Sequence, residues 1–218
     1  MNTQNYLIND IEPFSLSSEI KEIQKVFSQS TYTHIPVTTE KTYLGSISET
    51  DAYSFEASKQ LSDFQYALET FFVRKETNWL DILETFAQQS CNIMPVLGDN
   101  NEYIGYYELH DIMNLFSETP FLSESGGILV VETGIKDYSF SEICQIIESN
   151  SARILGIFIS KIENDIVQAT IKIGHSGMNA IVQTFRRYNY TVVSNHEEDK
   201  FLDELKQRSD YLDKYLNI

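Results

Sequence analysis

The first half of the chain contains two variants of one sequence pattern, and this duplication constrains the fold more than any single motif does. The segments HIPV at 34–37 and YLGSISETDA at 43–52 have counterparts in IMPV at 93–96 and YIGYYELHDI at 103–112. The prolines of the shorter segments lie 59 positions apart, and the glycines of the longer segments lie 60 apart. The two copies therefore align with one another if the turn between the two segments is one residue longer in the second copy.

Each copy has the pattern of a helix, a strand, a turn, a second strand and a closing helix. Apolar residues recur at helical spacing before each proline motif; they are Ile20, Ile23, Val26 and Phe27 in the first copy and Trp79, Ile82, Leu83 and Phe86 in the second. The closing helices are expected to begin near Asp51 and Asp111, because the amino end of a helix favours negative charge. Neither copy is long enough to bury a good core alone, so we expect the two to pair side by side.

Composition excludes several classes of function. The chain has 16 basic and 32 acidic residues, a net charge of −16, which disfavours binding to nucleic acid or to anionic membrane surfaces. The longest apolar runs, 128–131 and 154–159, are far shorter than the ~20 residues that a membrane span needs. The two cysteines, Cys91 and Cys144, lie far apart in apolar sequence, which suits buried thiols in a reducing compartment. We therefore expect a cytoplasmic protein.

A different pattern begins after Pro120. The Ser- and Gly-rich stretch 123–127 is expected to be a flexible joint. After it we expect a strand at 126–133, a helix that begins at 139, and a hairpin formed by 152–161 and 166–173. A second helix that begins at 176 and a last strand at 190–194 are expected to follow. This βαββαβ order is typical of a ferredoxin-like fold. The last segment, 197–218, carries an apolar stripe and predicts an amphipathic helix that either docks on the protein or forms a dimer zipper.

The repeated unit resembles the cystathionine-β-synthase (CBS) domain, whose pattern is a helix, a strand with a central Pro-Val, a turn, and Gly-hydrophobic-hydrophobic-Ser/Thr-x-x-Asp. The chain is similar to acetoin-utilisation-type CBS proteins, in which an ACT-like regulatory domain follows a CBS pair. The expected fold class is α+β. The expected domains are a CBS pair at 1–122, with copies at about 8–60 and 67–118, an ACT-like ferredoxin-like domain at 123–196, and the C-terminal helix at 197–218.

The resemblance implies that an adenosyl ligand binds in the cleft between the copies. In such pairs the motif Asp binds the ribose hydroxyls and the Ser or Thr faces a phosphate, roles that fall here on Ser48 and Asp51. The second copy keeps Asp111 but has Glu108 in place of Ser or Thr. A carboxylate ~4 Å from a phosphate is repulsive by about 1 to 4 kcal/mol. We therefore expect any phosphate-bearing nucleotide at the first copy.

Other interpretations of these residues remain open. Ser48 and Asp51 could instead cap the closing helix of the first copy, a role that both residue types perform for structural reasons. Arg74 and Lys75 are the best-placed positive groups for a phosphate, or else they form a solvated pair of charges. The predicted ligand-binding set also includes the strand prolines, Pro36 and Pro95.

The second domain has one further candidate site. In ACT-like domains that bind amino acids, the loop after the first strand reaches the ligand, and here that loop offers Gly134 and Asp137. The Pro-Gly pair often found there is absent, and an ordinary strand-to-helix connection also explains the loop. Glu108, His110 and Asp111 do not define a metal coordination shell, so no metal site is predicted. No catalytic residues are predicted either, since the chain has no nucleophile motif or phosphate-binding glycine loop.

The leading hypothesis is a non-enzymatic regulatory protein that acts as a homodimer on an unknown protein partner. It requires no cofactor, and an adenosine nucleotide or S-adenosylmethionine is its expected effector. Binding would shift the relative rotation of the two copies, and the second domain would sense that shift. The alternative is a ligand-free interaction or oligomerisation module whose clefts are vestigial and filled by side chains such as Tyr106 or Tyr107.

Overall fold

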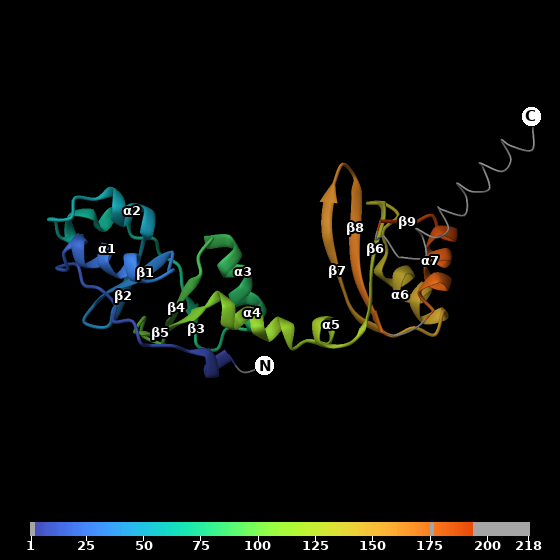
Figure 1. Ribbon diagram of the computed structural model, residues 1–218, viewed down its shortest axis with the longest axis horizontal. Helices are drawn as coiled ribbons and strands as arrows, with labels where there is room; N and C mark the ends of the chain where they lie inside the picture. Colours follow the sequence, from blue (N-terminus) through green and yellow to red (C-terminus); the bar gives the residue numbers. More distant parts are fainter. Residues whose placement is uncertain (1–2, 175–176, 194–218) are drawn as a thin grey trace, which may run out of the picture. The chain divides into compact units, whose positions relative to one another are not determined.

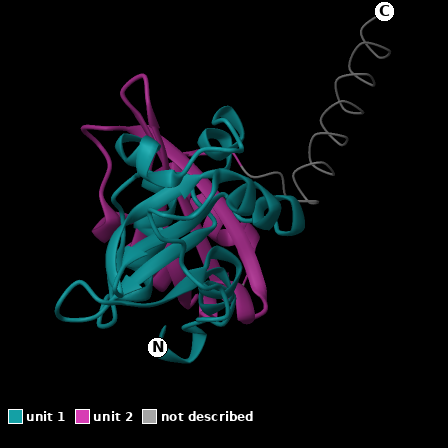
Figure 2. Cartoon of the chain, turned by 90° about the vertical axis from the view of Figure 1, so that its left-hand side faces the viewer, with its two compact units in different colours: residues 1–118 teal, residues 119–218 magenta. Residues whose placement is uncertain are grey.

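A computed structural model describes residues 3–174 and 177–193 of the chain. The chain forms two compact units: unit 1 is residues 1–118 and unit 2 is residues 119–218 (Figures 1 and 2). The first unit contains both copies of the repeat. The predicted C-terminal helix at 197–218 and the predicted helix cap at Ser176 lie outside the described residues.

Both copies have the predicted order of helix, hairpin and closing helix. After a short 3₁₀ helix, η1 (Thr3–Tyr6), the first copy consists of α1 (Ile20–Gln29), β1 (His34–Thr39), β2 (Thr42–Ser48), α2 (Glu49–Ser54) and the 3₁₀ helix η2 (Leu61–Ala67). The second consists of β3 (Val73–Arg74), α3 (Trp79–Gln89), β4 (Ile93–Leu97), β5 (Tyr103–Glu108) and α4 (Leu109–Ser117). The closing helices α2 and α4 begin two residues before the aspartates near which they were predicted to start.

The hairpins of the two copies have the same register. Pro36 pairs with Ser46 in the first copy, and Pro95 pairs with Tyr106 in the second. Each hairpin has one irregularity, directly after the valine of its proline motif. Because side chains alternate across a strand, this shared register directs equivalent residues to equivalent faces. The predicted helix stripes are largely buried, with Ile23 and Ile82 fully inaccessible to solvent.

Two extended segments interlock the copies. The first crossing segment, residues 8–14, pairs with β5 of the second copy at Ile8 and with β1 of the first copy at Phe14. The second crossing segment, residues 69–74, pairs with β2 at Glu69 and with β4 through β3. Each segment thus hydrogen-bonds to both copies, which confirms that they pack as one unit.

Unit 2 is built around a four-stranded antiparallel sheet. Its elements are α5 (Pro120–Ser123), β6 (Gly126–Gly134), α6 (Phe140–Ser149), β7 (Ile154–Glu163), β8 (Ile166–Gly174), α7 (Met178–Arg187) and β9 (Thr191–Val192). The strand order is β7-β8-β6-β9, with every neighbouring pair antiparallel. Helices α6 and α7 lie on one side of the sheet (Figure 1), and side chains of the sheet and both helices share one core.

The expected flexible joint at 123–127 is wrong in detail. Residues 120–123 form α5, and Gly126 and Gly127 already belong to β6. The ring of Phe121 in α5 lies 5.4 Å from that of Phe158 in β7, so this helix packs on the sheet of unit 2. Within the described part of the chain, no helix has the length and apolar character needed to cross a membrane.

Candidate ligand-binding site

A cavity of about 620 Å³ lies between the two copies of unit 1. The first copy contributes the end of α1 and the loop that leads into β1. The second copy contributes the residue before β4 and the start of α4. The lining residues are Ser28, Gln29, Ser30, Thr31, Tyr32, Asn92, Glu108 and His110. We call this space the second cleft, because it adjoins the Glu108-x-x-Asp111 motif of the second copy.

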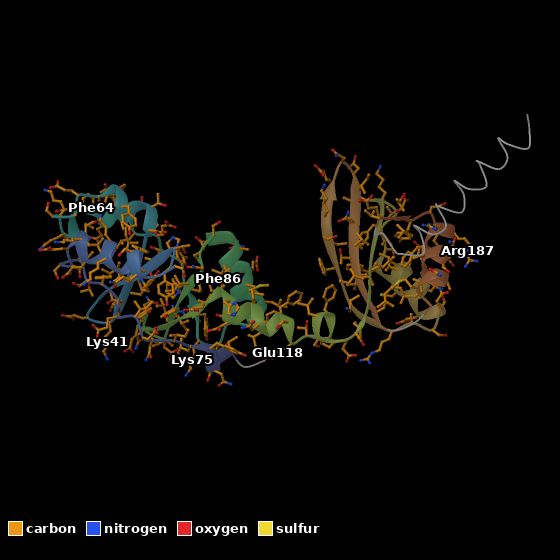
Figure 3. The ribbon with its side chains drawn as sticks, in the orientation of Figure 1. Lys41, Phe64, Lys75, Phe86, Glu118 and Arg187 are labelled. Atoms are coloured by element: carbon orange, nitrogen blue, oxygen red, sulfur yellow. The ribbon has the colours of Figure 1, made fainter. Side chains whose placement is uncertain are left out.

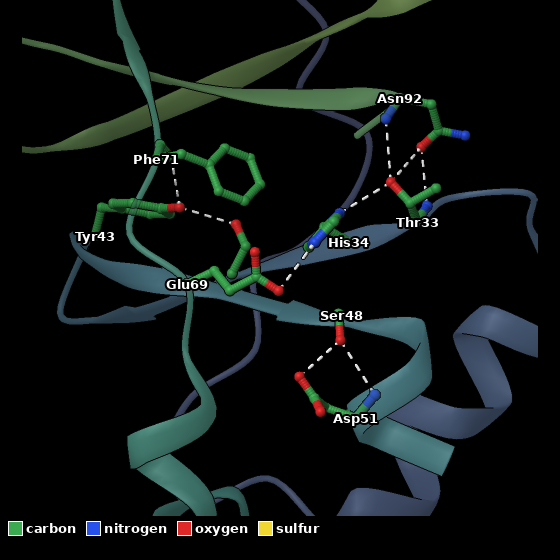
Figure 4. A network of polar contacts seen from close by, with 9 residues as sticks. Thr33, His34, Tyr43, Ser48, Asp51, Glu69, Phe71 and Asn92 are labelled. Atoms are coloured by element: carbon green, nitrogen blue, oxygen red, sulfur yellow. Dashed lines mark hydrogen bonds and ion pairs between the residues drawn. The ribbon is translucent and has the colours of Figure 1, made fainter. Parts of the chain in front are cut away.

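Thr33 and Asn92 join the copies beside this cleft (Figure 4). These residues stand at equivalent positions of the repeat, 59 apart, and the Asn92 side chain accepts hydrogen bonds from the Thr33 backbone at 2.9 Å and its hydroxyl at 3.1 Å. The Asn92 amide group also donates to the carbonyl of Thr31 at 2.6 Å. The cleft wall is therefore fixed by contacts that cross from one copy to the other.

A chain of hydrogen bonds joins two phenols and two carboxylates, of which Tyr32 and Glu108 line the cleft, whereas Tyr106 and Asp10 are not among the lining residues. Tyr32 donates a hydrogen bond to Glu108 Oε1 at 3.1 Å, and Tyr106 donates one to Asp10 Oδ1 at 2.6 Å. The two hydroxyl oxygens lie 3.3 Å apart. Burial, more than any other influence, raises the pKa of both phenols, and the neighbouring carboxylates raise it further. Both tyrosines therefore stay neutral donors at physiological pH.

The predicted pair Ser48 and Asp51 contact one another rather than any cavity described for unit 1 (Figure 4). Ser48 is the N-cap of α2; its Oγ accepts from the Asp51 backbone N–H at 3.1 Å and donates to Asp51 Oδ2 at 2.8 Å. This is the helix cap that the alternative interpretation expected. Glu108, at the equivalent position before α4, makes no such cap hydrogen bond, and Asp111 lies in the first turn of that helix.

The first copy has a polar network beside this cap, in which His34, Tyr43 and Ser46 are buried and Glu69 is exposed (Figure 4). His34 Nε2 lies 3.4 Å from Glu69 Oε1, and His34 Nδ1 lies 2.9 Å from the Thr33 hydroxyl. The hydroxyl of Tyr43 contacts Ser46 Oγ at 2.8 Å and donates to the carbonyl of Phe71 at 2.9 Å. The network links β1 and β2 to the second crossing segment.

The predicted positive groups lie away from the second cleft. Arg74 pairs with Leu97, at the end of β4 opposite to Asn92. Its guanidinium donates to the Gly98 carbonyl and, at 2.7 Å, to Asn101, so it fastens the turn between β4 and β5. Lys75 is exposed in the loop after β3 (Figure 3). Neither residue is among those that line the cleft.

The predicted prolines are buried inside their hairpins. Pro36 accepts a hydrogen bond from Phe14 of the first crossing segment at 3.0 Å, and Pro95 stands opposite Tyr106. Neither proline lines the second cleft. In the structure both positions belong to strand pairing.

Sequence reasoning missed Tyr32 and Asn92 as cleft residues. A position-by-position comparison of the copies could have found the first of them. Tyr32 stands where the second copy has Cys91, and Tyr106 stands where the first copy has Ser46. With Glu108 in place of Ser48, three larger residues thus replace three small ones in one chain of hydrogen bonds, and two of them, Tyr32 and Glu108, line the cleft.

A second cavity of about 620 Å³ lies in unit 2, at the end of β6. It brings together the two residues predicted from the loop, Gly134 and Asp137, with three segments that the prediction did not include. The further lining residues are Glu132, Thr133, Glu142, Ile166, Tyr188, Asn189, Tyr190 and Thr191. Tyr190 donates to Glu142 Oε2 at 2.8 Å, and burial above all raises the pKa of its hydroxyl.

The structure also shows the environment of the Cys91 thiol and how the possible metal-binding side chains are distributed. Burial raises the pKa of the Cys91 thiol to about 11, so this thiol is protonated at neutral pH. Among the described residues, no three or more His, Cys, Asp and Glu side chains are grouped so that they could hold a metal ion.

Comparisons with known proteins concern the repeat. No curated protein matches the chain. Similar solved structures include a CBS domain pair/ACT domain protein from Thermotoga maritima, with 18% identity, a TM-score of 0.49, and coverage of 54% of this chain and 98% of that one. The CBS domains of a Streptococcus pneumoniae transcriptional regulator have 14% identity, a TM-score of 0.47, and coverage of 52% and 98%. CBSX2 in complex with AMP has 15% identity, a TM-score of 0.43, and coverage of 53% and 95%. The second copy of the repeat, residues 67–118, matches the family model of the CBS domain.

Proposed function

We propose that unit 1 is a CBS pair that binds an adenosyl-type ligand and that the chain regulates a partner rather than catalysing a reaction. The observation that carries the proposal is the second cleft, which lies between the copies and beside the helix start of the matched CBS domain. Its volume of about 620 Å³ is within the range of small-molecule sites.

The first copy is the proposed site for a phosphate-bearing nucleotide. Ser48 and Asp51 are small polar groups at the amino end of α2, and the residues equivalent to the tyrosines of the second cleft are Ser46 and Cys91. An Asp can accept both hydrogen bonds of a ribose diol, which here requires the Ser48 hydroxyl to release Asp51 Oδ2. Ligand binding at this copy would therefore exchange the hydrogen bond between the Ser48 and Asp51 side chains for contacts with the ligand.

Unit 2 is the proposed ACT-like receiver of the ligand signal. The element order βαββαβ and the strand order β7-β8-β6-β9 support a ferredoxin-like fold. Gly134 and Asp137 line its cavity and would be the contacts of an amino-acid ligand if that unit binds one. A homodimer in the cytoplasm remains the proposed setting.

Calorimetry on the full chain tests the ligand proposal. Titration with AMP, ATP, adenosine and S-adenosylmethionine is expected to give saturable heat for at least one of them. Asp51→Ala should weaken nucleotide binding at least tenfold, since it removes the proposed ribose acceptor. Asp99→Ala, an exposed aspartate in the turn between β4 and β5, is the matched control and should bind as the wild type does. The absence of heat with all four compounds would refute the proposal.

One observation favours a second candidate function, a ligand-free interaction module. Tyr106 and Tyr107 are both fully buried, and the phenols of Tyr32 and Tyr106 already satisfy Glu108 and Asp10. Side chains thus provide contacts that a ligand would otherwise make. This alternative predicts that adenosyl compounds leave the thermal unfolding of the chain unchanged, whereas ligand binding raises the midpoint.

A further inference from the structure

We infer that the second cleft discriminates by charge: it accepts a nucleoside-type ligand with a neutral or cationic tail and excludes one with a phosphate. The inference rests on the proposed function, because it takes the adenosyl class from there. What it adds is the residue that selects within that class, Glu108, and the direction of the selection.

The Glu108 carboxylate is held in the cleft wall. The residue precedes α4, the position at which Ser48 caps α2 in the first copy, but the Glu108 side chain makes no cap hydrogen bond. Tyr32 from the first copy donates to Glu108 Oε1 at 3.1 Å instead. This hydrogen bond holds the carboxylate group in the wall of the cleft.

Among the lining residues that the structure describes, there is no lysine or arginine to compensate the charge of this carboxylate. The eight lining residues carry hydroxyl, amide and phenol groups, one carboxylate and the imidazole of His110. A second carboxylate, that of Asp10, lies at the other end of the chain of hydrogen bonds, two phenols away from Glu108 and 2.6 Å from the Tyr106 hydroxyl. The field in the cleft therefore favours a cation and opposes an anion.

The same wall offers groups to a ligand without phosphate. The lining includes the hydroxyls of Ser28 and Thr31, which are exposed to solvent and can therefore contact a ligand in the cleft. Glu108 Oε2, which Tyr32 does not use, can accept a hydrogen bond from a ligand hydroxyl or amine. Together these groups fit a ribose, or a ribose whose tail carries a positive charge.

The experiment compares adenosine, S-adenosylmethionine and AMP by calorimetry on the full chain in the Asp51→Ala background, which removes the proposed ribose contact of the first copy. We expect adenosine or S-adenosylmethionine to bind at least tenfold more tightly than AMP. Adding Glu108→Gln keeps an acceptor for Tyr32 but removes the charge, and should strengthen AMP binding at least tenfold. Glu22→Gln, an exposed glutamate in the first turn of α1, removes one charge far from the cleft and should change nothing.

The failures are distinguishable. AMP that binds the Asp51→Ala protein as tightly as adenosine, or that ignores Glu108→Gln, overturns the inference and leaves the proposed function standing. If Asp51→Ala abolishes the binding of all three compounds, every ligand binds at the first copy. That result also overturns the inference and leaves the proposed function standing. No binding of any compound to wild type or variants overturns both. Thermal unfolding of each variant shows whether it is folded.

Discussion

Replacement of Gly105 by alanine tests how the first crossing segment holds unit 1 together. Gly105 lies in β5 with φ +145°, a backbone conformation that is essentially restricted to glycine. A Cβ built on it would lie 2.3 Å from the carbonyl oxygen of Ile8, and Cβ contacts below 3.0 Å essentially never occur. Because the obstacle is backbone, the crossing segment itself must move.

The cost follows from what that movement breaks. A non-glycine residue in this conformation costs about 1–3 kcal/mol. Displacement of Ile8 also removes two backbone hydrogen bonds to Tyr106, at 2.9 and 2.8 Å, each worth about 1 kcal/mol. We therefore expect Gly105→Ala to lower the free energy of unfolding of unit 1 by about 3–5 kcal/mol, a large part of the ~5–15 kcal/mol typical of a domain.

Urea unfolding followed by tryptophan fluorescence measures this cost. Trp79 is the single tryptophan of the chain and packs against the core of the second copy, so its signal reports on unit 1. Gly98→Ala is the matched control, because its Cβ would be 3.6 Å from the nearest atom, Ile104 Cγ2, an ordinary contact. Gly45→Ala, with φ +155° and a nearest contact of 3.0 Å, should fall between the two. Equal midpoints for Gly105→Ala and Gly98→Ala would refute the crossing arrangement.

Three further predictions concern buried groups. Burial raises the pKa of Tyr43, Tyr106 and Tyr190 above the ordinary value and that of Cys91 to about 11, so the unfolded chain loses these protons first. These groups should not affect the free energy of unfolding below about pH 8, but it should fall as the pH rises past ~8.5–10, the pKa values of the same groups in the unfolded chain. Urea titrations at pH 8 and pH 10.5 that give the same free energy of unfolding would contradict this. Tyr106→Phe removes the donor to Asp10 and should cost about 1–3 kcal/mol in the same assay, as well as weaken the alkaline loss of stability. In unit 2, Phe121→Ala should lower the thermal midpoint through lost packing on Phe158, whereas Leu122→Ala, whose side chain is about half exposed, should have little effect.

The order of elements in both copies could be predicted because periodicity and repetition are local properties of sequence. The starts of the closing helices were placed two residues late for a physical reason. Asp51 was predicted to mark the start of the helix because acidic residues are favoured there. In the structure Ser48 is the N-cap, since its Oγ accepts the Asp51 N–H, and Asp51 is the third residue of the helix. The charge is at the helix terminus as expected, and the hydroxyl determines where the helix begins.

The segments that carry no periodicity could not be placed from sequence. Residues 8–14 have apolar side chains at Ile8, Ile11 and Phe14, a spacing of three that does not alternate as in a strand and so does not predict pairing with both copies. The glycines at 126 and 127 were interpreted as flexibility, whereas a Cβ at Gly126 would lie 2.1 Å from the Ile173 carbonyl oxygen. Glycine there permits two strands to approach closely, and composition alone does not separate that role from a hinge.

The candidate site was partly predictable. Glu108 and the tyrosine at 106 were recognised from the sequence, but their partners, Tyr32 and Asp10 respectively, come from segments 76 and 96 residues away along the chain. Such contacts depend on how the copies face one another, which the crossing segments determine. Gly134 and Asp137 were identified from a loop pattern, and the structure adds the carboxylates of Glu132 and Glu142 to the same cavity.

The two copies share hairpin register and crossing segments, so their differences at equivalent positions are informative about chemistry rather than about folding. Three of these differences, Tyr32, Tyr106 and Glu108, meet in one chain of hydrogen bonds beside the second cleft although they come from both copies. Packing of either copy alone does not require them together, because the small residues at the equivalent positions fit the same backbone. Their convergence therefore indicates that the second cleft has its own polar chemistry, and the paired variants at Asp51 and Glu108 separate that chemistry from the chemistry of the first copy.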